Sequence, residues 1–197
     1  MKVVHIIPAA FDYFDDIKTR AFSWVDEMSK YDLELEVLTI QYSTDKNNSD
    51  ASDKIKSDRR KFAGVISGQA GMANLSQFDL VHVHCPMLGG AGDLLKWIKS
   101  ESRPPLICTY HPAIKFPGIF GWLIRGYNQY YLPKIFVQAD IVTVYSDQAG
   151  CQQIARRYGV NGDSWLGLDD GQKNALTNHE VVLKLLAVYS QVVSKLI

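Results

Sequence analysis

Short, continuous apolar runs recur along the first 160 residues and are separated by longer mixed stretches. They lie at Val3–Ile7, Leu35–Ile40, Leu80–Val83, Leu106–Cys108 and Asp140–Tyr145, with a weaker one near Phe62–Ile66. Runs of this kind, bounded by breakers, are typical of strands buried on both faces of a parallel sheet. The pattern predicts an α/β fold with a doubly wound, Rossmann-like parallel sheet of about six strands and helices on both faces.

The stretches between these runs carry apolar residues at helical spacing. Helices are expected at Ile17–Met28, Gly92–Ser100, from about Ile119 to Phe136, and after Ser146. Asp15 or Asp16 can cap the first of them and Ser146 the last, because their side-chain oxygens accept hydrogen bonds from free backbone amides. Pro133 is expected to kink or split the third helix, and Gly159 can close the fourth in the left-handed conformation.

After residue 160 the alternation of apolar runs and mixed stretches stops. Residues 161–177 are rich in Gly, Asn and Asp and predict a connector between a domain at residues 1–160 and a helix at residues 178–197. Thr177 and Glu180 form a capping box at the start of this helix. Its apolar stripe is Val182, Leu185, Leu186, Tyr189, Val192, Val193 and Leu196. Because so many large aliphatic side chains are unfavourable in water, we expect the helix to pack back on the domain.

Composition narrows the classes of function. The 21 basic and 21 acidic residues cancel, so binding of nucleic acid through phosphate neutralisation is not expected. No apolar run reaches the ~20 residues of a membrane-spanning helix. Cys85, Cys108 and Cys151 form no CxxC pair, which favours reduced thiols and a cytoplasmic location. A dinucleotide cofactor would require GxGxxG after the first strand; residues 8–12 read Pro-Ala-Ala-Phe-Asp, and no cofactor is predicted.

Three histidines lie where predicted strands end. His82 and His84 are two apart on one strand, so both point to the same face, and His111 follows the next strand. Together they could form a three-histidine metal site, but no carboxylate in the motif completes or orients it, and no metal is predicted. The alternatives are a structural role, favoured for His82, and contact with a substrate, favoured for His84 and His111.

Topology predicts where a substrate would bind. In open α/β sheets ligands lie outside the carboxyl ends of the strands, and the loops after the first, fourth, fifth and sixth predicted strands all meet there. The substrate-binding residues expected in this crevice are Tyr13, His84 and Ser146, with His111 as the catalytic residue.

The order of several motifs resembles a known family. Asp79–His84, Thr109–His111, Ala139–Ser146 and Tyr158–Val160 follow one another as in the N-terminal domain of family 4 glycosyltransferases of the GT-B type. The resemblance implies two Rossmann-like domains facing each other across a cleft, with the acceptor on the N-terminal one and a nucleotide-sugar donor on the other. It also implies sugar transfer with retention and without a metal. His111 corresponds to the histidine at the reaction centre, and His84 to the one on the acceptor side.

Two features depart from that family. The loop at Ala9–Tyr13 lacks the glycine pair that usually approaches the donor phosphates, and after Val160 the sequence runs almost directly to its last helix instead of into a donor domain. We therefore expect an acceptor-binding half that is inactive alone, whose partners are a sugar or lipid-linked acceptor and, together with a donor domain, a nucleotide sugar. The alternative is a non-catalytic module that binds a small molecule or another protein. The aromatic region Phe116–Phe136 is a candidate for peripheral membrane contact, on the inner face of the membrane.

Overall fold

A single parallel sheet forms the centre of the computed structural model. The structure describes residues 1–8, 15–40, 61–65, 74–87, 90–100, 102–112, 118–160, 164–168 and 176–194. The strands are β1 (Lys2–Pro8), β2 (Glu34–Ile40), β3 (Lys61–Val65), β4 (Leu80–Cys85), β5 (Leu106–Tyr110), β6 (Ile141–Val144) and β7 (Trp165–Gly167). They pair in parallel in the order β3-β2-β1-β4-β5-β6-β7. The order reverses direction at β1, so β1 and β4 flank the topological switch point.

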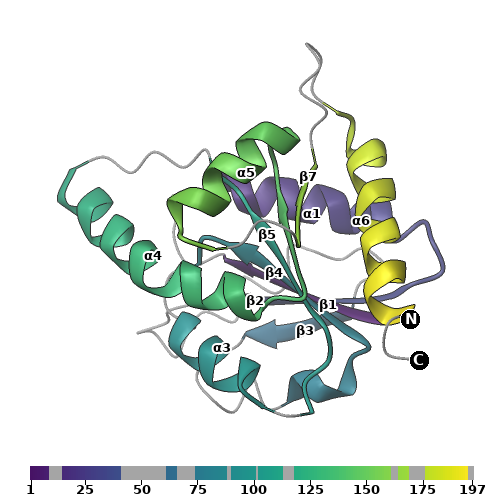
Figure 1. Cartoon of the computed structure of the whole chain (residues 1–197). Coiled ribbons are helices and arrows are strands. Elements are labelled where there is room, and N and C mark those ends of the chain that lie inside the picture. Colours follow the sequence, from purple (N-terminus) through teal and green to yellow (C-terminus); the bar gives the residue numbers. More distant parts are fainter. Residues whose placement is uncertain are drawn as a thin grey trace.

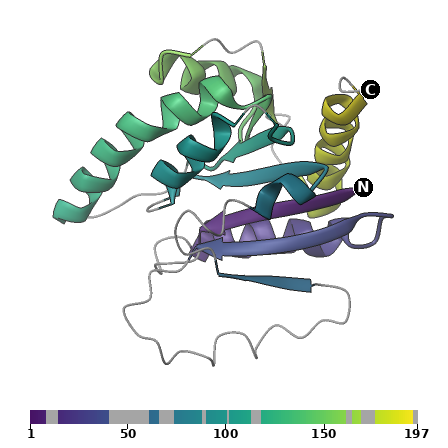
Figure 2. The same ribbon diagram turned by 90° about the horizontal axis from the view of Figure 1, so that it is seen from below.

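Helices cover both faces of this sheet (Figures 1 and 2), which confirms the predicted doubly wound fold. One face carries α1 (Asp15–Met28) and α6 (Asn178–Ser194), which touch each other. The other carries α3 (Ala91–Ile98), α4 (Gly118–Gln138) and α5 (Gln148–Arg157). A 3₁₀ helix at Asn74–Gln77 precedes β4. Because successive strand residues point to opposite faces, the sheet separates two apolar cores.

The core beneath α1 and α6 surrounds the site described below. Trp24 of α1 and Leu185 of α6 are buried there against strand residues such as Val3 and Ile107. The expected packing of the C-terminal helix on the domain is therefore confirmed. Its buried residues are Val181, Val182, Leu185, Val188, Tyr189 and Val192, whereas Leu186 and Val193 are only partly buried. The predicted stripe was thus rotated slightly away from the true one; Leu196 lies outside the described residues.

Several local predictions can be compared directly with the structure. Asp147, not Ser146, caps α5, because its carboxylate accepts a 2.7 Å hydrogen bond from the Gly150 amide. Gly159 has φ +67°, the left-handed conformation expected after that helix. The α4 helix continues through Pro133 without splitting. The capping box is confirmed: the Thr177 amide donates to the Glu180 carboxylate at 2.7 Å.

The sheet has one strand more than the sequence predicts. The additional strand, β7, lies inside residues 161–177, which were predicted as a connector, so this part of the connector extends the sheet beside β6. Gly167 of β7 packs directly on the start of α5. A Cβ atom at Gly167 would lie 2.7 Å from the Ser146 carbonyl oxygen and 2.9 Å from the Gln148 nitrogen, so glycine is required at this contact.

Candidate functional site

The strands at the switch point bring polar side chains to the face covered by α1 and α6. His5 of β1 is in register with His82 of β4, and His84 is in register with Thr109 of β5. His111 follows β5 directly, and its amide donates to the Cys85 carbonyl oxygen. All four imidazole rings are buried, with exposed fractions of 2% or less. A row of histidines therefore crosses the middle of an otherwise apolar core.

Hydrogen bonds join the rings nearest the carboxyl edge of the sheet. Nη1 of Arg20 lies 3.3 Å from Nδ1 of His111, and Nε2 of His111 lies 3.2 Å from Nδ1 of His84. Nε2 of His84 then lies 3.1 Å from Nδ1 of His5. Arg20 belongs to α1 and is only partly buried, so this end of the row lies nearest to solvent.

The row continues deeper into the core through a residue of the last helix. The Tyr189 hydroxyl lies 3.3 Å from Nε2 of His5 and 2.5 Å from Nδ1 of His82. Nε2 of His82 lies 2.6 Å from the Thr109 hydroxyl, which lies 2.6 Å from the Thr143 hydroxyl. We call these eight residues the histidine network: Arg20, His111, His84, His5, Tyr189, His82, Thr109 and Thr143.

The direction of every hydrogen bond in the network follows from its first member. Arg20 can only donate, so Nδ1 of His111 accepts and its Nε2 carries the proton. The same argument applies to each following ring, so in all four histidines Nδ1 is the acceptor and Nε2–H is the donor. Tyr189 then accepts from His5 and donates to His82. Each ring is neutral, and each of its nitrogens has one partner.

Burial keeps these rings neutral. Desolvation lowers the pKa of His5 to about 3. It lowers the pKa of His111 to about 3 as well, and the Arg20 guanidinium adds to that shift. For His82 and His84, desolvation first and the neighbouring histidines second hold the pKa well below its usual range. The charged form of an imidazole is disfavoured wherever water is excluded, which agrees with the tautomers derived from the hydrogen bonds.

Aromatic rings fix the end of the network near Arg20. The Trp24 ring stacks on His111, with centroids 5.5 Å apart and an angle of 25° between the planes. The Arg20 guanidinium lies 4.2 Å from the centroid of the Tyr145 ring, a cation–π contact. The outer nitrogen of His111 therefore faces a cation that is itself held in place. This arrangement can present one positive charge and one neutral hydrogen-bond acceptor.

The structure brings together two of the predicted site residues. His84 and His111 share a hydrogen bond at the carboxyl edge, as the strand-end argument predicts, and His82 lies deeper against Thr109, in the structural position expected for it. The Ser146 hydroxyl is partly buried and lies 3.5 Å from a carboxylate oxygen of Asp147. Tyr13 lies outside the described residues. The functional roles of these residues remain predictions.

Five members of the network were not predicted from the sequence: His5, Arg20, Tyr189, Thr109 and Thr143. His5 interrupts an apolar run and so was read only as part of a strand. Arg20 lies one helical turn before the buried Trp24, and a cation on the buried face of a helix is a signal that could have been used. Tyr189 was assigned to the apolar stripe of the last helix; the role of its hydroxyl depends on where that helix docks.

The same rings include the one group, among the described residues, whose geometry could admit a metal ion. His5, His82 and His84 can offer nitrogens within 4.8 Å of one another; the sequence had suggested His111 in place of His5. All six nitrogens of these rings already take part in hydrogen bonds. A metal ion could therefore bind these three rings only by displacing hydrogen bonds that the structure already contains. The hydrogen bonds account for the cluster without a metal.

The fold is that of a Rossmann-like α/β domain, with a row of buried histidines at the switch point of its sheet. Comparison with models of protein families assigns the chain to one family. The model for Glycosyltransferase Family 4 matches residues 50–164, which is 115 of the 197 residues. The chain belongs to this family. The matched range includes His82, His84, His111 and Ser146, while His5, Arg20 and Tyr189 lie outside it.

A solved structure has a similar fold. It is described as an alpha-glucosyltransferase in complex with UDP-glucose and DNA containing an abasic site, and it matches with a TM-score of 0.51 and 11% sequence identity. The match covers 90% of this chain but 41% of the other, so the chain spans about two fifths of that enzyme. At this identity the likeness concerns the fold. No curated protein sequence matches the chain.

Proposed function

We propose that the chain is the acceptor-binding half of a retaining glycosyltransferase, which transfers a sugar from a nucleotide-sugar donor. The observation that carries the proposal is the His111–His84 pair at the carboxyl edge of the switch point, in a chain of this family. The acceptor is a sugar or a lipid-linked sugar. The donor is held by a second domain of the kind the family uses, and this chain alone transfers little or no sugar.

The tautomer of His111 defines what it can do. Its inward nitrogen donates to His84, so only Nδ1 can meet a ligand, and there it can only accept. A substrate hydroxyl that displaces Arg20 would donate its proton to Nδ1 and be oriented by it. The released guanidinium would remain nearby as a donor for a negatively charged or hydroxyl-rich group. In this proposal His111 positions the reacting sugar, and Tyr13 and Ser146 contribute further contacts.

Binding of carbohydrate is the direct test. A panel of mono- and oligosaccharides is added to the ¹⁵N-labelled chain, and the imidazole nitrogens are followed by NMR. We expect a subset of sugars to shift the His111 resonances, and His111→Ala to abolish that binding. His179→Ala is the matched control, because His179 is exposed at the start of α6. If no sugar perturbs His111, or if the His111→Ala variant binds equally well, the proposed acceptor site is wrong.

The donor side has a separate test. Recognition of a diphosphate requires several converging donors and positive charge, and the loop after β1 carries bulky and acidic residues in its sequence. Calorimetry with common nucleotide diphosphate sugars should therefore detect only very weak binding. If this chain alone bound a nucleotide sugar with micromolar affinity, the donor site would lie on this chain, and our proposal that a second domain holds the donor would be wrong.

One observation favours the alternative of a non-catalytic binding module. Both nitrogens of His111 already have partners, and the ring is almost fully buried. In that case a ligand would bind at Arg20 without displacing it, and His111→Ala would lower stability while leaving ligand affinity unchanged. The NMR titration separates the two functions, because only the acceptor site requires a change at Nδ1 of His111.

A further inference from the structure

A row of exposed residues follows one side of α4, far from the histidine network. Trp122, Tyr130 and Val137 are exposed to 71%, 61% and 63%, although large apolar and aromatic side chains usually avoid such exposure. Their spacing, together with exposed Gly126 and Lys134 between them, places them along a single face of the helix. The opposite face of α4 is buried in the core through residues such as Ile135. The helix therefore presents large apolar and aromatic side chains, together with Lys134, on the side that faces away from the core.

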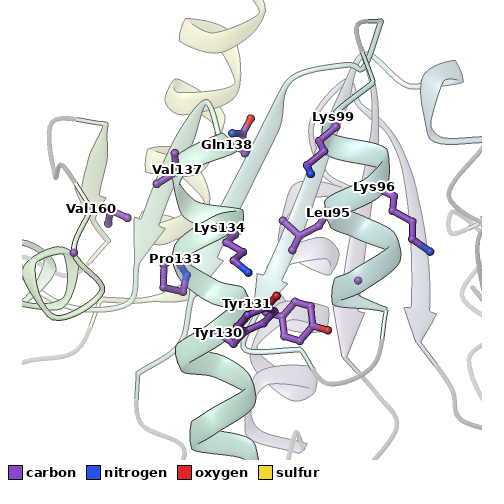
Figure 3. A pocket seen from close by; sticks show the side chains of 12 residues that line it. Leu95, Lys96, Lys99, Tyr130, Tyr131, Pro133, Lys134, Val137, Gln138 and Val160 are labelled. Carbon is purple, nitrogen blue, oxygen red and sulfur yellow. The ribbon is translucent and has the colours of Figure 1, made fainter.

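A groove runs between this face of α4 and the neighbouring helix α3 (Figure 3). Its volume is about 610 Å³. It is lined by a mixture of basic, aromatic and aliphatic side chains that includes Leu95, Lys96, Lys99, Tyr130, Lys134 and Val137. No carboxylate is among its lining residues, and the sequence of α4 contains no Asp or Glu. The groove is thus both basic and amphipathic.

The lysines of the groove are held differently. Nζ of Lys134 lies 3.2 Å from the centroid of the Tyr130 ring, so the cation is pinned over an exposed aromatic face. Lys96 pairs with Asp93 one turn earlier on α3, at 3.4 Å. Lys99 has no acidic partner within the described part of the chain. At least two cations, Lys99 directly after α3 and Lys134 on α4, are therefore available to an anion that enters the groove.

We propose that this face, formed by Trp122, Tyr130 and Val137 with the groove lysines, docks on an anionic phospholipid surface. Tryptophan and tyrosine favour the boundary between headgroups and acyl chains, because one end of each ring is apolar and the other polar. Lysines attract anionic headgroups. None of the described helices is long and apolar enough to cross a bilayer. The contact that we propose is with the membrane surface.

Charge complementarity favours an anionic phospholipid surface as the partner of this face. A neutral apolar partner would leave Lys99 and Lys134 without counter-charges, whereas a surface rich in phosphate groups neutralises both while the rings enter the interface. The aromatic region highlighted in the sequence, Phe116–Phe136, overlaps this face. The structure adds the groove, the lysines of α3 and the C-terminal turns of α4. The inference is independent of the proposed sugar transfer, because its test measures membrane binding alone.

Vesicle co-sedimentation tests the proposal with the full chain. Vesicles of phosphatidylcholine with phosphatidylglycerol should bind the protein, and vesicles of phosphatidylcholine alone should not. Each basic residue near such a surface contributes roughly a fivefold gain in affinity. The double variant Lys99→Glu/Lys134→Glu should therefore bind at least about 30-fold more weakly. The control Lys30→Glu/Lys184→Glu changes the net charge equally on the opposite face and should bind like the wild type.

Tryptophan fluorescence provides a second readout. Of the four tryptophans, Trp122 is the one with an exposed ring, so its emission should shift to the blue on anionic vesicles and the shift should disappear in Trp122→Phe. Equal loss of binding in both charge-reversal variants would show an unspecific charge effect and overturn the proposal. Equal binding to neutral vesicles would overturn it too. So would binding of soluble glycerol phosphate in the groove without any binding to vesicles.

Discussion

Acidification should unfold this protein over a pH range that the histidine network determines. The folded state keeps four buried imidazoles neutral, while the unfolded chain lets each of them take up a proton near its ordinary pKa of 6.5. Because the folded pKa is lower than the unfolded one, the unfolded state binds more protons at mildly acidic pH. Stability is therefore complete above about pH 6.5 and declines as the pH falls toward 3.

The magnitude follows from the two histidines with a defined shift. At pH 5 an unfolded histidine is almost fully protonated, and a folded one with a pKa of about 3 is almost fully neutral. This difference lowers the free energy of unfolding by about 2 kcal/mol per ring. His5 and His111 together account for about 4 kcal/mol, and His82 and His84 shift in the same direction. A typical domain has only ~5–15 kcal/mol in total, so a cooperative acid transition should occur well above pH 3.

The assay is urea denaturation from pH 8 down to pH 4, followed by circular dichroism. Near pH 5 the slope of unfolding free energy against pH should correspond to uptake of at least two protons. His111→Gln should reduce that uptake by about one proton. A stability that is flat between pH 8 and 5 would refute the reasoning, as would an NMR titration that gives these buried rings pKa values near 6.5.

Two substitutions and one deletion test the structure around the histidine network. Tyr189→Phe removes one hydroxyl but leaves one nitrogen of His5 and one nitrogen of His82 without a partner, and urea denaturation should show a loss of about 2–4 kcal/mol; an unchanged midpoint would contradict the role of the hydroxyl. Gly167→Ala forces a methyl group against the backbone at the start of α5, and we expect a loss of about 1–3 kcal/mol in a thermal melt. Deletion of residues 178–197 should expose the core and abolish cooperative unfolding; a truncated monomer with an unchanged melting temperature would show that α6 is not part of the fold.

The strands could be predicted because their signal is local and redundant. Runs such as Leu80–Val83 are buried on both faces, so nearly every position is apolar, His82 being the exception, and no partner has to be known. The strand β7 was missed for the opposite reason. It spans only Trp165–Gly167, its central residue Leu166 is partly exposed, and its neighbours are polar. Its place in the sheet is set by packing of Gly167 on α5, a tertiary contact that no local pattern contains.

The candidate site could be predicted only in part. Strand ends and spacing were enough to group His84 with His111, because parallel topology determines which edge they share. The bond from His5 to His84 depends instead on the register between β1 and β4, and that from Tyr189 to His82 on the rotation of α6 about its axis. Neither the strand register nor the rotation of the helix can be predicted from a short stretch of sequence. For Arg20 a local signal was present, because this cation lies one helical turn before the buried Trp24 of α1.

The direction of the hydrogen bonds limits the chemistry available to His111. A proton accepted at its outer nitrogen could be passed inward only through Nε2, by shifts through His84, His5 and Tyr189 in turn, and within the described residues this path ends at the buried Thr109 and Thr143 hydroxyls. The pKa of about 3 for His111 also makes it a weak general base at neutral pH. Both arguments favour a ring that orients a hydroxyl over one that removes its proton. Tyr189 of α6 only passes the inward relay on to His82 and the buried Thr109 hydroxyl, so the contact that His111 offers a substrate is acceptance of a hydrogen bond at Nδ1.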